Sequence, residues 1–227
     1  MSLIECPECG KLISSRSTVC INCGYQLNNN TYKTGDIISF GKYPLYSNDK
    51  TEQPIKWKVI DVKDDKMLII TEKCIEAKMF HEEKGPITWE NCSLRKWLNN
   101  DFFAIAFSKE EQGKILLSEL KNEDNGPFNI SGANVPNTKD KIFILSKQEA
   151  YKYFDSDLER QSKVTDHAKD NGADYDILYG NGRWWLRTTY QQLGIAFAVL
   201  FLGRVGEFGY YLNDEDGCIR PTMWIKK

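Results

Sequence analysis

The sequence contains few histidines, no long apolar run and no excess of positive charge. His81 and His167 are the only histidines, and we expect both on the surface because neither has nucleophile or metal-ligand spacing. The longest apolar run, residues 195–202, is far shorter than the ~18 residues of a membrane-spanning helix. A formal net charge of -2 gives no general attraction to nucleic acid, and no glycine-rich phosphate loop precedes a helical pattern. The N-terminus lacks the pattern of a signal peptide, so a cytoplasmic location is expected.

The composition is that of a globular protein kept in a reducing compartment. Hydrophobic residues make up 41% of the 227 residues and charged residues 27%, enough for one buried domain and a small appendage. The cysteine count is odd, at 7, and Cys74, Cys92 and Cys218 are widely scattered. This distribution argues against a disulfide framework.

The other four cysteines form two C-x-x-C-G pairs, Cys6/Cys9 and Cys20/Cys23. Two residues between thiolates allow both sulfurs to reach one ion, and four thiolates close a tetrahedral shell typical of structural zinc. Because a segment this short cannot bury a core, the metal would supply most of its folding energy. We therefore predict a zinc ribbon at residues 1–25 that resembles those found in many bacterial proteins.

A polar linker at residues 26–34 precedes a second domain at residues 35–227. Residues 35–41 predict a first strand, and alternation predicts a hairpin of residues 55–62 with 67–70. Helical spacing of apolar residues occurs within residues 89–98.

Two S-x-x-E capping boxes, at residues 108–111 and 146–149, predict helix starts. Residues 141–145 predict a strand, and residues 122–137 and 171–182 predict long loops. Strands and short helices together predict an α+β fold.

The last fifth of the chain, residues 183–224, has recurring glycines in a frame of small apolar residues, between two tryptophan anchors. Such glycines indicate a compact meander of tight turns. The positions between them are bulky aromatics and charges without a clear period, as in a binding surface.

Three separated motifs occur in order: residues 88–99 (TWENCSLRKWLN), residues 139–146 (KDKIFILS), and the W-W-L-R to R-P frame from Trp184 to Pro221. Together they resemble a bacterial domain-of-unknown-function family, often joined to a zinc ribbon. The resemblance implies a C-type-lectin-like domain related to formylglycine-generating enzymes. Some members of that family are variable proteins of diversity-generating retroelements, so the resemblance also implies this role, in which a fixed frame holds diversified positions. Two departures from the family pattern are Thr188-Thr189 and Cys218.

The resemblance divides the terminal stretch into a fixed frame and a candidate ligand-binding set. The frame would be Ala196, Val199, Gly203, Val205, Gly209 and Leu212. The candidate set, called the C-terminal face below, would be Tyr190, Gln191, Leu200, Phe201, Leu202, Arg204, Glu207, Phe208, Tyr210, Tyr211, Asn213, Asp214 and Asp216.

Two interpretations of this stretch stay open: a core β-meander with mixed surface residues, or a face that binds a ligand, most simply a protein. Tryptophans 184, 185 and 224 are expected to pack in the core. Residues 213–217 (NDEDG) predict a solvated hairpin tip, since they lack the ligand pattern of a calcium loop.

A non-enzymatic binding module is the leading functional hypothesis. The alternatives are a formylglycine-generating-like enzyme acting through Cys218, and an adaptor that contacts nucleic acid or protein through the ribbon. A lone thiol without an identifiable partner gives catalysis little support.

Overall fold

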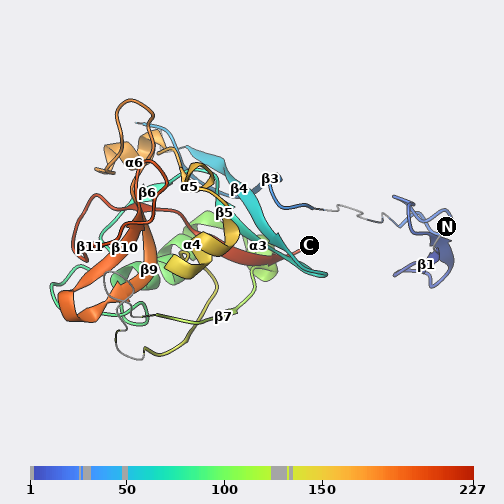
Figure 1. The fold of residues 1–227 in the computed structure, drawn as a ribbon. Helices are drawn as coiled ribbons and strands as arrows, with labels where there is room; N and C mark the ends of the chain where they lie inside the picture. Colours follow the sequence, from blue (N-terminus) through green and yellow to red (C-terminus); the bar gives the residue numbers. More distant parts are fainter. Residues whose placement is uncertain (1–2, 26, 28–31, 48–50, 124–131, 133–134) are drawn as a thin grey trace. The chain divides into compact units, whose positions relative to one another are not determined.

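The computed structural model describes residues 3–25, 27, 32–47, 51–123, 132 and 135–227 (Figure 1). The chain divides into two compact units, residues 1–32 and 33–227. Of the predicted linker at residues 26–34, residues 26 and 28–31 lie outside the described residues.

The first unit is built on one hairpin. Strands β1 (Leu3–Glu5) and β2 (Leu12–Ser14) pair antiparallel, with Ile4 opposite Ile13. Leu27 donates its backbone N–H to Thr18 O at 2.8 Å and packs with Cys6, Ile13 and Cys20. The small apolar cluster of the ribbon therefore extends to Leu27, two residues beyond the predicted end.

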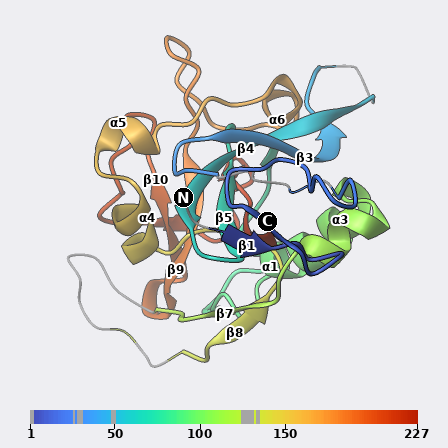
Figure 2. The same cartoon turned by 90° about the vertical axis from the view of Figure 1, so that its right-hand side faces the viewer.

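The second unit is a mixed α+β structure in which short helices pack against two larger sheets (Figures 1 and 2). One sheet has the order β13-β5-β4-β3 and the other the order β11-β10-β9-β12-β6. The strands are β3 (Ile37–Pro44), β4 (Glu52–Val62), β5 (Lys66–Thr71), β6 (Glu76–Ala77), β7 (Ser118–Leu120), β8 (Thr138–Asp140), β9 (Trp184–Tyr190), β10 (Ile195–Val199), β11 (Tyr210–Tyr211), β12 (Cys218–Ile219) and β13 (Thr222–Lys226). The helices are α1 (Ser93–Trp97), α2 (Phe103–Ala106), α3 (Lys109–Lys114), α4 (Lys147–Tyr153), α5 (Asp157–Arg160) and α6 (Asp166–Asp170), with the π-helical η1 (Leu98–Phe102) and the 3-10 turn η3 (Gln191–Leu193).

The predicted hairpin is the centre of the four-stranded sheet. Strands β4 and β5 pair antiparallel, and Lys63 N donates to Lys66 O at 2.8 Å to close the turn. On its other side β5 pairs with β13, the last strand of the chain. The beginning and the end of the second unit therefore share one sheet.

Both predicted capping boxes are present. Ser108 caps α3 and Ser146 caps α4, each accepting from the backbone N–H three residues on, while the Glu111 and Glu149 carboxylates accept the backbone N–H of the cap residue. Each pair satisfies two N–H groups that a helix leaves without a partner.

The segment with predicted helical spacing is only partly α-helical. Helix α1 begins at Ser93, and the chain passes through the π-helical η1 into α2. Leu94, Leu98 and Phe102 are buried, so the apolar stripe faces the core even though the helix changes its pitch.

The predicted strand at residues 141–145 is wrong. The Asn99 side chain accepts the backbone N–H of Lys141 at 2.9 Å and of Ile142 at 3.2 Å, and donates to Ile142 O at 2.8 Å. Phe143 makes an isolated bridge with Thr222. The Asn99 side chain thus satisfies the backbone of the first two residues, while Phe143 exchanges backbone hydrogen bonds of 3.0 and 2.7 Å with Thr222 of β13. The segment therefore meets a strand at one residue and forms no continuous ladder. Most of the predicted loop at residues 122–137 lies outside the described residues.

The five-stranded sheet carries the terminal stretch. Strands β9, β10 and β11 form an antiparallel meander, as predicted. Strand β12 instead crosses to the far side of β9 and pairs parallel to it, at Cys218 and Trp184. Among the residues that the structure describes, no helix has the length and apolarity required to cross a membrane.

Candidate functional site

The four ribbon cysteines lie around one point. Their sulfur atoms are all within 4.8 Å of one another, with Cys6 and Cys23 3.6 Å apart and Cys9 and Cys20 3.8 Å apart. Zinc–sulfur bonds of about 2.3 Å in a tetrahedron place sulfurs about 3.8 Å apart, so the donor set fits zinc in size and chemistry.

The knuckles are shaped by the glycine after each cysteine pair. Gly10 and Gly24 have φ of 68° and 76°, and their N–H groups donate to Cys6 O and Cys20 O at 2.9 and 2.8 Å. Four thiolates leave no open coordination position, so the ion would stabilise the ribbon and would not activate a substrate.

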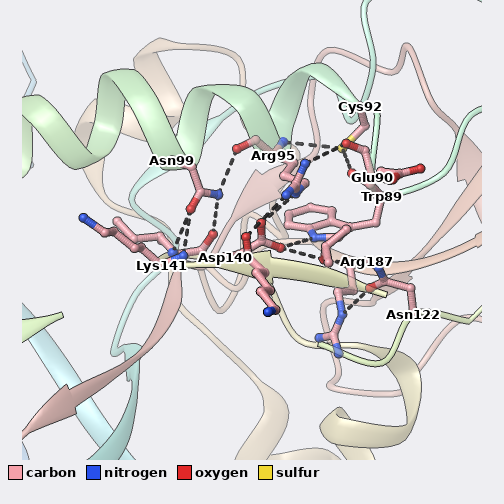
Figure 3. A network of polar contacts seen from close by, with 12 residues as sticks. Trp89, Glu90, Cys92, Arg95, Asn99, Asn122, Asp140, Lys141 and Arg187 are labelled. Atoms are coloured by element: carbon pink, nitrogen blue, oxygen red, sulfur yellow. Dashed lines mark hydrogen bonds and ion pairs between the residues drawn. The ribbon is translucent and has the colours of Figure 1, made fainter. Parts of the chain in front are cut away.

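The first two motifs of the resemblance meet at one buried carboxylate, Asp140 (Figure 3). Trp89 Nε1 donates to Asp140 Oδ2 at 2.9 Å, and Arg95 Nε donates to Asp140 Oδ1 at 2.6 Å. Asp140 is 1% exposed, so the pair is an internal cross-link between α1 and β8. These residues therefore hold the fold together.

The W-W-L-R motif is also internal. Trp184 and Trp185 are 0% exposed, and Arg187 is 2% exposed. Arg187 forms an ion pair with Glu149 and donates to Asn122 Oδ1 at 3.2 Å and to Ile144 O at 3.0 Å. A buried guanidinium needs such a full set of acceptors.

Arg220 of the R-P motif is likewise buried, between the rings of Trp184 and Phe154 at 5.1 and 5.5 Å. Its Nε donates to Thr71 O at 2.8 Å. Burial lowers the pKa of Arg220 to about 10, partly opposed by Cys74 and Glu72. The predicted packing role of Trp184 and Trp185 is confirmed, while Trp224 is half-buried.

The proposed frame is buried. Ala196, Val199, Gly203, Val205 and Leu212 are buried and Gly209 is partly exposed. Gly203 has φ of 85°, and a Cβ there would lie 1.7 Å from Asp157 O. Gly217 has an ordinary φ, but its Cβ would lie 1.8 Å from Trp185 Nε1. Glycine is thus required at the first position by backbone angle and space, and at the second by space alone.

The C-terminal face is distributed differently. Its exposed members are Leu202, Arg204, Glu207, Phe208 and Tyr211. Its half-buried members are Gln191, Leu200, Phe201, Tyr210, Asn213, Asp214 and Asp216. Tyr190 is 7% exposed and its hydroxyl donates to Gln192 Oε1 at 2.6 Å, so it offers little surface to a ligand.

A groove of about 740 Å³, the C-terminal groove, lies at one part of this face. It is lined by Lys84, Gly85, Pro86, Gln191, Gln192, Leu193, Gly194, Tyr211, Leu212, Asn213 and Asp214. Gln191, Tyr211, Asn213 and Asp214 belong to the candidate set. Residues 84–86 come from a distant part of the sequence, where no local pattern indicated a site.

Residues 213–217 are partly solvated, with Glu215 exposed and the Asp216 side chain 47% exposed, but they are not a hairpin tip because β11 and β12 do not pair with each other. Arg183, which is 3% exposed, forms ion pairs with Asp216 and with Asp174, the latter at 3.2 Å. Its guanidinium lies 4.1 Å from the ring centre of Tyr210. Asp216 is held by this buried cation, which needs a compensating charge, while Glu215 stays exposed.

Cys218 has a neighbour that the sequence did not indicate. A Cβ on Gly182 would lie 2.6 Å from Cys218 Sγ and 3.4 Å from Cys74 Sγ, and both cysteines are 0% exposed. A hydrogen bond with Cys74 and burial raise the pKa of Cys218 well above its ordinary value. Neither cysteine lines the C-terminal groove. A buried, protonated thiol is a poor nucleophile.

Both histidines are half-buried, contrary to the predicted surface placement. His81 Nδ1 accepts the backbone N–H of Ser93 at 3.3 Å, at the start of α1. His167 Nε2 lies 3.2 Å from Glu76 Oε2, which also accepts from Tyr43 Oη at 2.7 Å. His167, Glu76 and Tyr43 are scattered in the sequence, so no spacing could have revealed this cluster.

Together these features define a mixed α+β protein with an N-terminal four-cysteine metal-binding module. A family model described as "Domain of unknown function (DUF6273)" matches residues 64–227, and one described as "zinc-ribbon domain" matches residues 2–27. The first match covers more than half of the chain, and the chain therefore belongs to the DUF6273 family. No curated protein and no solved structure matches it.

Proposed function

We propose that this chain is a non-enzymatic binding protein whose C-terminal face contacts a protein ligand, on a domain with a C-type-lectin-like fold. The observation that carries the proposal is the division of one short stretch into a buried frame and an exposed set. The frame residues Ala196, Val199 and Val205 are buried, while Leu202 and Tyr211 are 64% and 67% exposed. Large apolar and aromatic side chains on a concave surface are typical of binding sites.

We further propose that the face is diversified, as in a variable protein of a diversity-generating retroelement. Such a protein must keep its fold while its contact residues change. Here the motif residues Asp140 and Arg187 pair with Arg95 and Glu149, and none of these four residues belongs to the C-terminal face. Substitutions at Leu202, Arg204 or Glu207 would remove little buried surface.

The ribbon serves in this proposal as a zinc-stabilised accessory module. The cysteines of the second unit, Cys74, Cys92 and Cys218, are unpaired thiols, which suits a cytoplasmic location. An enzyme acting through Cys218 has less support, because that thiol is buried and its pKa is raised. Nucleic-acid binding through the ribbon also has little support, since Lys11 and Arg16 balance Glu5 and Glu8 there.

The test of diversification is deep sequencing of this locus in a growing population. Codons for residues 188–217 are compared with the control codons for residues 138–160, and the flanking DNA is searched for a near-identical template copy. We expect adenine-linked variation at the C-terminal face, with frame codons and control codons constant. Uniform codons and no template would refute diversification.

The test of binding is photo-crosslinking in the source cells. A benzoylphenylalanine at Tyr211, 67% exposed on the face, is compared with one at Tyr151, 52% exposed in α4. We expect a discrete crosslinked species at Tyr211 alone. Equal labelling at both positions would contradict a dedicated face.

A further inference from the structure

The C-terminal groove joins an apolar surface to one carboxylate. Tyr211 and Leu193 are 67% and 57% exposed, and Pro86 lies beside them in the lining. The charged residues that line the groove are Lys84 and Asp214. Such a site suits a ligand group that has an apolar body and a charged end.

The sign of that charge follows from the surroundings of Asp214. Residues 214–216 are all acidic, and the nearby buried cation Arg183 is already paired with Asp216 and Asp174. Lys84 is exposed, so its flexible ammonium group can stay in water. The rim near Asp214 therefore carries an excess of negative charge.

Asp214 is itself incompletely compensated. Burial raises the pKa of Asp214 and Asp216 adds to the effect, while Arg183 and the backbone of Tyr211 oppose it without cancelling it. An ionised carboxylate in this position gains more from a ligand cation than a fully hydrated one would.

We infer that the C-terminal groove binds an arginine side chain of a protein partner, with the aliphatic stem against Leu193 and Tyr211 and the guanidinium at Asp214. Arginine fits better than lysine because its planar guanidinium stacks on an aromatic ring and pairs with a carboxylate through two N–H groups. This inference rests on the proposed binding function and names the chemistry that the face recognises.

The experiment uses the full, zinc-loaded chain and three capped pentapeptides, Ala-Ala-X-Ala-Ala, in which X is arginine, citrulline or norleucine. Citrulline keeps the shape of arginine without its charge. Binding is followed by ¹H–¹⁵N NMR. We expect shifts at Leu193, Tyr211 and Asp214, and an affinity for the arginine peptide at least about tenfold above that for the citrulline peptide, as for a charge-assisted hydrogen bond.

Two variants separate a direct contact from general attraction. Asp214→Asn should abolish the preference for arginine over citrulline. Glu215→Gln removes a neighbouring exposed carboxylate that does not line the groove, and should retain the preference. If both variants lose it equally, the cause is the overall negative charge and the inference is overturned.

Stability supplies a further control. A carboxyl whose pKa is raised by folding binds protons more tightly in the folded state, so it opposes folding above its ordinary pKa. Asp214→Asn should therefore keep or raise the midpoint of thermal unfolding at neutral pH. A lower midpoint would make Asp214 a structural residue and would count against the inference.

The remaining outcomes are distinguishable. Equal binding of all three peptides at the groove would overturn the arginine inference and leave the proposed binding face standing. Absence of shifts at the groove with every peptide would also overturn it, and the crosslinking at Tyr211 would then decide the proposed function separately.

Discussion

Gly217, another glycine of the terminal stretch, is the position where the packing of that stretch is most directly testable. A Cβ at residue 217 would lie 1.8 Å from Nε1 and 2.2 Å from Cε2 of Trp185. Trp185 is 0% exposed, donates to Lys78 O at 2.9 Å and packs edge-on against Phe80. Neither backbone nor a buried indole can move away cheaply, so Gly217→Ala must displace the ring.

The cost can be worked from two contributions. Overpacking a core costs about 1–3 kcal/mol. Loss of the indole hydrogen bond adds about 1 kcal/mol. We expect Gly217→Ala to lower the free energy of unfolding by about 3 kcal/mol, which for a domain of this size lowers the melting temperature by about 6–12 °C. The matched control is Gly206→Ala, whose Cβ would meet Ala198 O at 3.4 Å and Leu200 Cδ2 at 3.6 Å. That change should alter stability by less than about 1 kcal/mol.

The assay is urea unfolding followed by tryptophan fluorescence. The 6 tryptophans all lie in the second unit, so the signal reports that unit alone. If the unfolding free energies of the two proteins depend equally steeply on urea concentration, the shift of the urea midpoint gives the change in stability. A Gly217→Ala protein within about 1 kcal/mol of the parent, or equal losses in both variants, would refute the role assigned to Gly217.

Three further predictions follow from the same structure. Glu149→Gln should destabilise the second unit near the lower end of the about 3–5 kcal/mol expected when a buried ion pair is broken, because the Glu149 side chain is 25% exposed; urea unfolding measures it, and an unchanged midpoint would contradict it. Removal of zinc with a chelator should abolish the chemical-shift dispersion of residues 3–25 and 27 and leave that of the second unit unchanged, because the apolar cluster of the ribbon is too small to hold its fold. Ribbon signals that stay dispersed without metal would show the prediction wrong. Burial raises the pKa of Glu111, but hydrogen bonds from Ser108 and Gly41 outweigh it and lower the pKa below its ordinary value of 4.5. The stabilisation by the ionised carboxylate is present above the ordinary pKa and is lost as pH falls through the lowered pKa. The melting temperature of Glu111→Gln should therefore lie below that of the parent at pH 7 and converge with it in acid.

Local patterns predicted the elements whose hydrogen bonds are local. The hairpin β4–β5 and the caps at Ser108 and Ser146 are present as expected, because their partners are close in sequence. The strand predicted at residues 141–145 failed for the opposite reason. The backbone of its first two residues is satisfied by the distant Asn99 side chain and that of Phe143 by Thr222, and no local period reports such partners.

The candidate site divides in the same way. Spacing alone predicted the four cysteines that the structure brings within 4.8 Å of one another, since C-x-x-C positions two sulfurs locally. The family resemblance supplied the frame and the candidate face. Neither the spacing of residues nor the resemblance could show that Tyr190 is buried. The contribution of residues 84–86 to the groove could not be predicted either, because it depends on how two distant loops pack.

Cysteine spacing, hydrophobic period and motif order were enough to predict the zinc ribbon, the α+β class and the family of the second unit. The ion pairs of Arg183 with Asp174 and Asp216, the place of Asp214 in the groove lining and the contact of Cys74 with Cys218 depend instead on tertiary packing. The physical reason is that a buried charge or thiol takes its partners from whatever segments the fold brings near, and their distance along the chain imposes no constraint.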